Sequence, residues 1–317
     1  SNNTGFGNEV FDDLTSGDNN TGVGSQALAK LTTGEKNTTV GESSGAAVTT
    51  GARNTLIGYA AGDAITTGDD NVALGDGALG AATTASDNVA IGAAALNANT
   101  TGTDNVAVGA QAGIVVTTGS DNTLIGDGAA DALTTGSNNT AVGSGTLSAA
   151  TTADNNTAVG AAALAANTTG AKNTAVGALA GGANTTGSSN VGIGVDALNS
   201  NTTASNNTAV GTNALDANTT GGENTAVGLD ALGANTTAAN NVAVGCAALA
   251  ANLAADNTAV GRAALEANTT GTSNTAVGSR ALDSNTTGIE NVAIGKSALT
   301  ANTTGTHITA MGNASLD

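Results

Sequence analysis

A five-residue motif, Asn-Thr-Ala-Val-Gly, recurs along the whole chain, as at residues 173–177, and constrains the fold more than any other feature. The motif begins at Asn3 and returns every 17 residues as far as Asn241. It then returns once after 16 residues, at Asn257, and every 17 residues again as far as Ile308, which makes 19 units. A fixed period of this length predicts a solenoid, in which each unit is one rung that buries its apolar residues by stacking on its neighbours.

We therefore expect an all-β fold, a parallel β-solenoid of 19 rungs of about 17 residues, forming a single domain over residues 1–317. Aromatic residues make up only 1% of the chain, too few for a globular core of this length, whereas Val, Ile, Leu and Ala can fill a thin solenoid. Disorder is the competing explanation for a chain rich in Gly, Thr and Asn. The strict periodicity of the apolar residues argues against it.

The rung is numbered from position 1, its Asn, to position 17. Position 5 is Gly in all 19 units, which predicts a corner with positive φ or a close backbone approach. We expect the Asn side chains at position 1 to form a stacked amide ladder. Positions 2 to 4 alternate like a short strand, as in Val89, Ala90 and Ile91. The bulkier residues at 2 and 4 are expected to share one side, leaving Ala at 3 on a flat side where another chain can pack.

Positions 8 and 9 are usually Ala-Leu, and this Leu is expected to be the main core residue of the second segment. Where position 9 is Gly or Ala, position 12 is often a large apolar residue, as in the pair Gly45 and Val48. This exchange predicts that positions 9 and 12 point toward the same interior. The unit with Gly181 has Asn184 at position 12, so Leu179 is expected to fill its core from another position.

The net charge of −18, from 25 acidic and 7 basic residues, disfavours nucleic acid and anionic membranes as partners. No signal peptide, transmembrane run or membrane-inserting segment is visible in the sequence. Since the repeat fills the chain from residue 3 to its end, we expect it to be a segment of a longer protein or a subunit of a filament.

Three features that can signal chemistry are weak here. The Gly-x-Gly-x-x-Gly at 75–80 has no βαβ context, so we expect no dinucleotide site. His307 is the only histidine and Cys246 the only cysteine, and they lie more than three rungs apart. We therefore expect no catalytic residues, no enzyme activity and no bound cofactor, apart from the cation considered next.

Four aspartates occupy position 17 in successive rungs: Asp70, Asp87, Asp104 and Asp121. Stacked carboxylates at a spacing of roughly 4.8 Å repel one another by about 1 kcal/mol per pair in water, and a cation such as Ca²⁺ would relieve this. These four residues are the candidate metal site. The alternative is an exposed turn, because Asn138 and other uncharged residues occupy the same position elsewhere.

Thr-Thr pairs recur at positions 13 and 14, as at Thr134 and Thr135. Regular ranks of threonine can order water in the manner of ice-binding surfaces. Such surfaces need a flat array at alternating strand positions, whereas these adjacent threonines lie at a turn and expose one hydroxyl each. Water ordering is therefore a minor alternative.

The rung motif resembles the head repeat of trimeric autotransporter adhesins (YadA-like heads), with the nearest matches Asp-Asn-Val-Ala-Ile-Gly at 87–92 and Asn-Asn-Val-Ala-Val-Gly at 240–245. The longer pattern, which continues to Asn-Thr-Thr-Gly, is similar to repeats of tail-fibre-like proteins. The resemblance implies a left-handed parallel β-roll, three chains around one axis and adhesion at a cell surface or on a virion. It transfers no catalytic residues, and the period here is longer than in the adhesin head.

These observations together predict a non-enzymatic, extracellular structural or adhesive fibre rod at a cell surface or on a virion, most simply a homotrimer. Its partners would be copies of itself, as a trimer or a polymer, and a host-cell or matrix surface bound through many weak repeated contacts. The alternatives are a subunit of a self-assembling extracellular filament and a Ca²⁺-binding or ice-binding solenoid.

Overall fold

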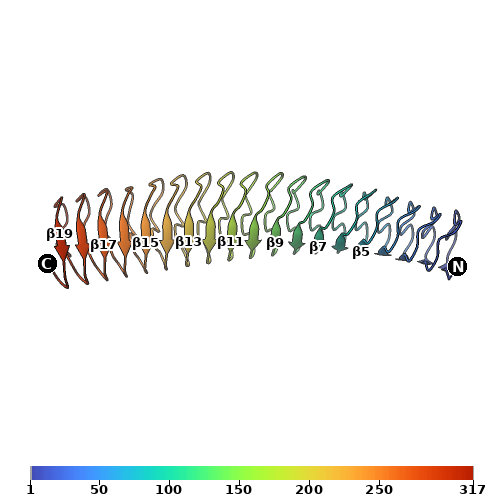
Figure 1. The fold of residues 1–317 in the computed structure, drawn as a ribbon, viewed down its shortest axis with the longest axis horizontal. Coiled ribbons are helices and arrows are strands. Elements are labelled where there is room, and N and C mark those ends of the chain that lie inside the picture. The colour runs from blue at the N-terminus through green and yellow to red at the C-terminus, as the bar shows by residue number, and fades with distance from the viewer. Residues whose placement is uncertain (1, 317) are drawn as a thin grey trace. The chain divides into compact units, whose positions relative to one another are not determined.

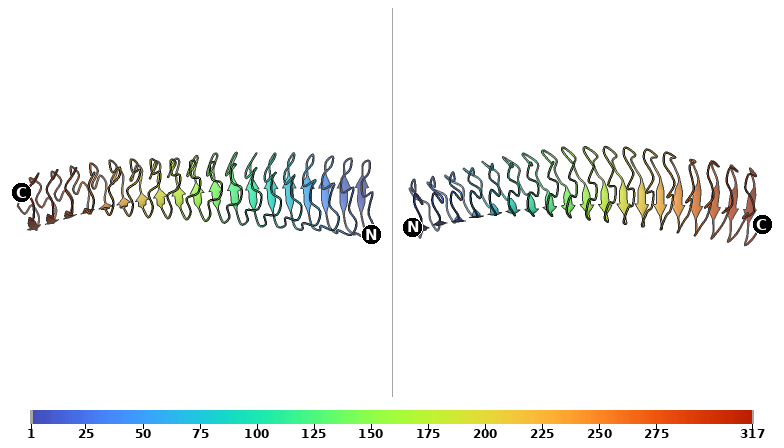
Figure 2. Two further views of the ribbon diagram at one scale, coloured as in Figure 1. Left: turned by 90° about the horizontal axis from the view of Figure 1, so that it is seen from above. Right: turned by 180° about the vertical axis from the view of Figure 1, so that it is seen from behind.

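The computed structural model describes residues 2–316 and confirms an all-β parallel β-solenoid. Tertiary contacts group the chain into two compact units, Ser1–Asn156 and Thr157–Asp317. In each unit every rung contributes one three-residue strand (Figure 1, Figure 2). The strands of the first unit are β1 (Thr4–Phe6), β2 (Thr21–Val23), β3 (Thr38–Val40), β4 (Thr55–Ile57), β5 (Val72–Leu74), β6 (Val89–Ile91), β7 (Val106–Val108), β8 (Thr123–Ile125) and β9 (Thr140–Val142). Those of the second unit are β10 (Thr157–Val159), β11 (Thr174–Val176), β12 (Val191–Ile193), β13 (Thr208–Val210), β14 (Thr225–Val227), β15 (Val242–Val244), β16 (Thr258–Val260), β17 (Thr275–Val277), β18 (Val292–Ile294) and β19 (Thr309–Met311).

Neighbouring strands within each unit pair in parallel, so that equivalent positions of successive rungs lie side by side. Val89 pairs with Val106 in the first unit, for example, and Thr208 pairs with Thr225 in the second. In-register stacking turns every position of the repeat into a column of like residues. The hydrogen bonds, packing and surface properties of each unit therefore depend on which residue type fills each column.

The predicted Asn ladder at position 1 is confirmed. Asn105 donates its backbone N–H to Asn88 Oδ1 at 3.0 Å and its Nδ2 to the same oxygen at 3.2 Å. The Nδ2 of Asn105 also donates to the carbonyl of Gly119 at 2.9 Å. The Asn105 side chain is fully buried, so these bonds satisfy polar groups that would be costly to leave unpaired.

The predicted corner at position 5 is also confirmed. Gly109 has φ 141°, and a Cβ added there would overlap the carbonyl oxygen of Gly126 in the next rung. Only glycine combines this backbone conformation with such a close approach between rungs. The same two constraints apply to the glycines of this column from Gly7 to Gly126 and from Gly160 to Gly295, which have φ between 131° and 146°.

Many residues other than glycine adopt a left-handed conformation at positions 7, 9 and 17. In one rung, Ala94, Leu96 and Asp104 have φ of 56°, 49° and 58°. This geometry directs backbone groups along the stack: the N–H of Ala94 bonds to the carbonyl of Asp76, and the N–H of Leu96 bonds to that of Ala112. A left-handed Leu costs about 1–2 kcal/mol, which rung-to-rung hydrogen bonding and burial of the side chain offset.

The expected orientation of the strand was wrong: Ala at position 3 points into the solenoid, and the larger residue at position 4 points outward. Ala107 is fully buried, whereas Ile125 is 38% exposed. The reason is the Leu at position 9, which occupies most of the thin interior and leaves room for only a methyl group opposite. A Cβ placed at Gly192, position 3, lies 3.6 Å from Leu198 Cδ1 in the same rung.

The predicted exchange between positions 9 and 12 is confirmed, because the residues at both positions are buried. Val116 is fully buried in the rung where position 9 is Gly113. A third position takes part that the repeat did not reveal: Leu124, at position 3 of the next rung, fills the remaining space with its Cδ1 close to where a Gly113 side chain would lie. Leu56 does the same beside Gly45 and Gly62.

The second unit fills position 12 differently, with a buried Asn in every rung from Asn167 to Asn285. These side chains form a second amide ladder, in which Asn184 Nδ2 donates to Asn167 Oδ1 at 2.8 Å and Asn201 Nδ2 donates to Asn184 Oδ1 at 2.9 Å. Each Asn also caps its own turn, as when Asn201 Nδ2 bonds to the carbonyl of Ala204. The sequence pattern indicates how much volume the residue at position 12 fills, but it does not reveal these hydrogen bonds.

One rung of the second unit, residues 241–256, is one residue short because Leu253 stands where other rungs have a Thr-Thr pair. The first amide ladder continues across it, since the N–H of Asn257 donates to Asn241 Oδ1 at 3.0 Å. The second ladder is interrupted, because Asn252 Nδ2 turns to the carbonyl of Ala254 at 2.6 Å. Asn235 Oδ1 is left buried without a hydrogen-bond partner among the described residues.

Candidate interaction surfaces

The outward strand face consists of positions 2 and 4 in every rung. Position 2 is Thr or Val, and position 4 is Val, Ile or Leu except for Phe6 and Met311 in the end rungs. Residues at position 4 are exposed or half-buried, among them Leu74 at 44% and Ile193 at 40%. No charged side chain lies in either column.

The size of this face can be set against known interaction surfaces. With about 4.8 Å between rungs and about 3.3 Å per strand residue, nine or ten rungs present roughly 400–500 Å² in each unit. Exposed apolar patches of a few hundred Å² commonly mark interaction sites. An uncharged face that pairs Thr or Val at position 2 with a large apolar residue at position 4, on a chain with a net charge of −18, is therefore the strongest candidate for a binding surface.

The aspartates at position 17 lie where the sequence placed them, in successive exposed turns. Their φ values are 58° for Asp70, 60° for Asp87, 58° for Asp104 and 59° for Asp121. Asp and Asn tolerate this left-handed region better than most residues, which gives these aspartates a conformational reason to be there. Within residues 2–316 no three His, Cys, Asp or Glu side chains come together in a way that could hold a metal ion. Cation binding by the four aspartates stays a prediction.

Arg53, at position 17 of the preceding rung, neutralises the first aspartate of this column. Its Nε and a terminal nitrogen lie 2.6 Å and 2.7 Å from the two carboxylate oxygens of Asp70, and Asp69 lies 3.4 Å away. The hydrogen bonds from Arg53 lower the pKa of Asp70 below its ordinary value. Both side chains are exposed, so the pair contributes little to stability despite its geometry.

Position 16 carries a further ladder that sequence reasoning missed. The backbone N–H of Ala52 donates to Asp69 Oδ1 at 2.7 Å, and that of Asp69 donates to Ser86 Oγ at 3.0 Å. In the second unit, Ser188 donates in the same way to Ser205 Oγ at 3.0 Å. The frequent Ser and Asp at this position are the only sequence signal of it.

The two threonines of the Thr-Thr pair have different roles. Thr117 at position 13 donates its hydroxyl to the carbonyl of Thr134 in the next rung at 3.1 Å. Thr118 at position 14 is exposed, and its hydroxyl has no partner among the described residues. Only one rank of the pair is therefore available to a ligand.

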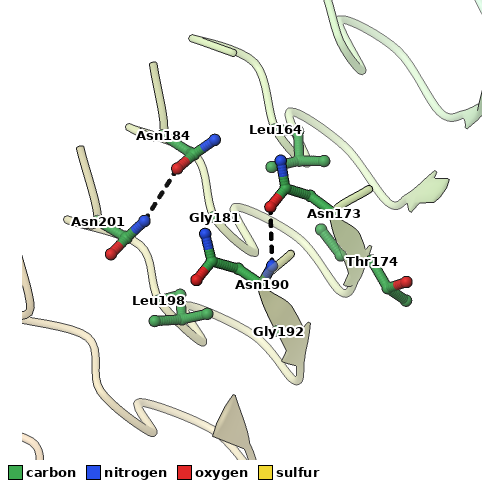
Figure 3. A pocket seen from close by; sticks show the side chains of 10 residues that line it. Leu164, Asn173, Thr174, Gly181, Asn184, Asn190, Gly192, Leu198 and Asn201 are labelled. Carbon is green, nitrogen blue, oxygen red and sulfur yellow. Dashed lines mark hydrogen bonds between the residues drawn. The ribbon is translucent and has the colours of Figure 1, made fainter. Parts of the chain in front are cut away.

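A small cavity of about 10 Å³ lies in the second unit beside Gly181 (Figure 3). It arises because Gly181 replaces Leu at position 9 and Gly192 replaces Ala at position 3 of the next rung, while Asn184 adds no apolar volume. Leu179 does not fill the gap as expected, because it is 44% exposed. A space of this size holds one water molecule at most, so it is a packing defect rather than a ligand site.

The residues that carry possible chemistry remain scattered. The Nε2 of His307 lies 2.9 Å from a carboxylate oxygen of Glu290, and Cys246 is exposed. Gly75, the first glycine of the dinucleotide-like motif, is a position 5 corner with φ 144°. Nothing in the described part of the chain brings these residues into one site.

The described residues contain no helix of the length and apolarity that a membrane crossing requires. No family model matches the chain, and a search of curated proteins finds no match either.

Proposed function

We propose that this chain is a non-enzymatic structural and adhesive fibre protein, whose copies associate through the strand faces of positions 2 and 4. The assembly we propose is a homotrimer of left-handed β-rolls outside the cell, at a cell surface or on a virion. It would attach to a host-cell or matrix surface. The observation that supports the proposal is the uncharged face of Thr or Val at position 2 and large apolar residues at position 4, repeated in every rung of an otherwise acidic chain.

The ladders described above also favour a structural role. The Asn and Thr side chains of positions 1, 12 and 13 form hydrogen bonds with neighbouring rungs, so they hold the stack together and do not line a ligand pocket. Such columns stabilise a stack whose length is set by the number of repeats. Adhesion would then come from many weak contacts acting together.

The test is the mass of the full chain in solution, measured by light scattering, for the wild type and for Ile125→Lys with Ile193→Lys. Both isoleucines are exposed, so the double variant should fold, but desolvating two ammonium groups should disperse the assembly. Thr118→Lys with Thr186→Lys is the matched control on another exposed column. A wild-type mass of one chain would refute self-association, and a large polymer would favour the filament instead.

A second candidate is favoured by the same face. Thr at position 2 and Val or Ile at position 4 form two flat ranks at alternating strand positions, as in Thr123 and Ile125, which is the array that water ordering needs. The Thr-Thr turn does not provide it. Thermal hysteresis of a monomeric wild type, lost in the isoleucine double variant, would establish ice binding in place of self-association.

A further inference from the structure

A shallow groove of about 450 Å³, wide open to solvent, runs along the second unit at positions 14 to 17 of three rungs. Thr203 and Thr220 form one wall at position 14, and Asn206, Glu223 and Asn240 form the other at position 17. The floor consists of the small residues Ala204, Ser205, Gly222 and Ala239. The groove lies on a different part of the rung from the strand face of positions 2 and 4.

The groove exists because of the residues at position 16. In these rungs position 16 is Ser205, Gly222 and Ala239, which are small residues like Ala52 and Ser188 in other rungs. Asp69 and Ile289 are larger residues at the same position. A Cβ added at Gly222 would lie close to the carbonyl oxygen of Ser205, at 3.1 Å, and would meet no other atom within 4 Å.

The walls offer polar groups that the protein does not use. The hydroxyls of Thr203 and Thr220, the amides of Asn206 and Asn240 and the carboxylate of Glu223 are exposed and make no hydrogen bond or ion pair among residues 2–316. The backbone nearby is occupied, since the N–H of Glu223 bonds to the carbonyl of Ser205 and that of Asn240 bonds to that of Gly222. A ligand would therefore be bound by side chains rather than by added strand pairing.

These groups select for one chemical class. Hydroxyls and amides both donate and accept hydrogen bonds, which matches a polyol. The groove has no aromatic or large apolar anchor of the kind that dominates protein interfaces. Glu223 and the net charge of −5 on residues 157–317, from nine acidic and four basic side chains, disfavour anionic polymers.

We propose that this groove binds a short stretch of an extended, uncharged β-linked polysaccharide, which would be the surface ligand of the adhesive function proposed above and rests on it. Successive rungs repeat the same wall groups about every 4.8 Å, a spacing close to the rise of one sugar ring in an extended β-linked chain. Each ring would meet one Thr hydroxyl on one side and one position 17 side chain on the other.

The experiment is isothermal titration of the full chain with three hexasaccharides: β-1,4-linked glucose, N-acetylglucosamine and xylose. We expect saturable binding of at least one, and at least a tenfold loss of affinity in Gly222→Ile, which introduces at position 16 the residue that another rung has at Ile289. Gly233→Ile is the matched control, because Gly233 lies at position 10, where another rung has Ile114. Neither glycine has a positive φ.

A second variant, Asn206→Gly with Asn240→Gly, removes the wall amides without touching the floor, and glycine accepts the left-handed φ of 63° and 61° at these positions, so it should also weaken binding. The proposal is overturned if the wild type binds none of the three sugars, or if Gly222→Ile and the double variant bind as the wild type does. The mass of the same samples, measured by light scattering, distinguishes failure of the proposed assembly from failure of the proposed sugar site. Sugar binding by a monomer would refute the assembly alone, and a trimer that binds no sugar would refute the groove alone.

Discussion

Asn88 Oδ1 accepts two hydrogen bonds from Asn105, one from its backbone N–H at 3.0 Å and one from its Nδ2 at 3.2 Å. Asn105 Oδ1 accepts the equivalent pair from Asn122 in the next rung. One carboxamide per rung therefore links three consecutive rungs. Neither Asp nor Ala can do this, because Asp has no Nδ2 donor and Ala has no side-chain polar group.

We expect Asn105→Ala to destabilise the first unit by about 3 kcal/mol or more. The substitution removes the acceptor of the Asn122 N–H and the donor to the Gly119 carbonyl, and an unpaired buried polar group costs roughly 1–3 kcal/mol. Chemical denaturation followed by circular dichroism measures the change. Thr101→Ala, on the exposed column of the preceding rung, should change stability by less than about 0.5 kcal/mol.

Gly109→Ala should be among the most damaging single substitutions, with a loss of more than about 3 kcal/mol. It combines a left-handed φ with overlap between the added Cβ and the Gly126 carbonyl. Gly145→Ala is the control: its φ is 62°, but the added Cβ would meet nothing within 4 Å. A loss of only about 1 kcal/mol is expected there, and equal losses in both variants would contradict the close approach between rungs.

Gly181→Leu should raise stability by about 1 kcal/mol, because the new side chain would fill the cavity together with the space that Leu164 leaves when it moves aside; Leu164 Cδ2 lies 3.0 Å from where the added Cβ would be. The Leu would occupy a left-handed position at which most rungs of this unit already hold Leu, so its packing gain should exceed the conformational cost. Gly181→Ala carries the same conformational cost with little packing gain, and it should lower stability. Thermal unfolding of the two variants tests this, and a Leu variant no more stable than the Ala variant would contradict it.

Asp216→Asn should stabilise the second unit at neutral pH. Partial burial, with smaller contributions from the charges of Asp230 and Asp196, raises the pKa of Asp216 above its ordinary value of 3.8. The folded state then binds the proton more tightly than the unfolded state, so stability falls as the pH rises from about 4 through the raised pKa.

The gain from Asp216→Asn should be below about 1 kcal/mol, because much of the carboxyl is exposed, and it should disappear below about pH 3.5, where Asp216 is protonated in both states. Melting temperatures across pH 3 to 8 measure it. Asp283→Asn, at the same position of another rung but without aspartates at position 7 of the adjoining rungs, is the control. A gain independent of pH would rule out this explanation.

The repeat predicted those features that depend on its period. A fixed interval places Asn88 beside Asn105 whatever the conformation of the rung. Glycine at the same position of every unit indicates a backbone conformation or a close approach that other residues cannot adopt. The orientation of the strand was not predictable in this way, because alternation reveals two faces without revealing which one is inside. Leu96 decides that question from the opposite segment, and its left-handed backbone is a conformation that nothing in the residue type announces.

The surfaces were less predictable than the core. Alternation alone does not decide whether Ile125 is buried or exposed. The groove at Gly222 depends on small residues at position 16, and the sequence does not show which way this position faces. The column of Asp70, Asp87, Asp104 and Asp121 was visible in the sequence, but the left-handed turn that favours such residues was not.

The shortened rung at residues 241–256 shows how the chain responds to a change in its own length. Losing one residue interrupts the amide ladder at Asn235 and the threonine ladder at Thr236, whose hydroxyl has no acceptor in the next rung among the described residues. The loss falls at an outward turn, so the strand pairing of β15 with β16 continues in register. Gaining or losing a whole rung within a unit would disturb still less, since each contact joins equivalent places in adjoining copies. Duplication or deletion of the coding repeat can therefore change the number of rungs without requiring any new type of contact.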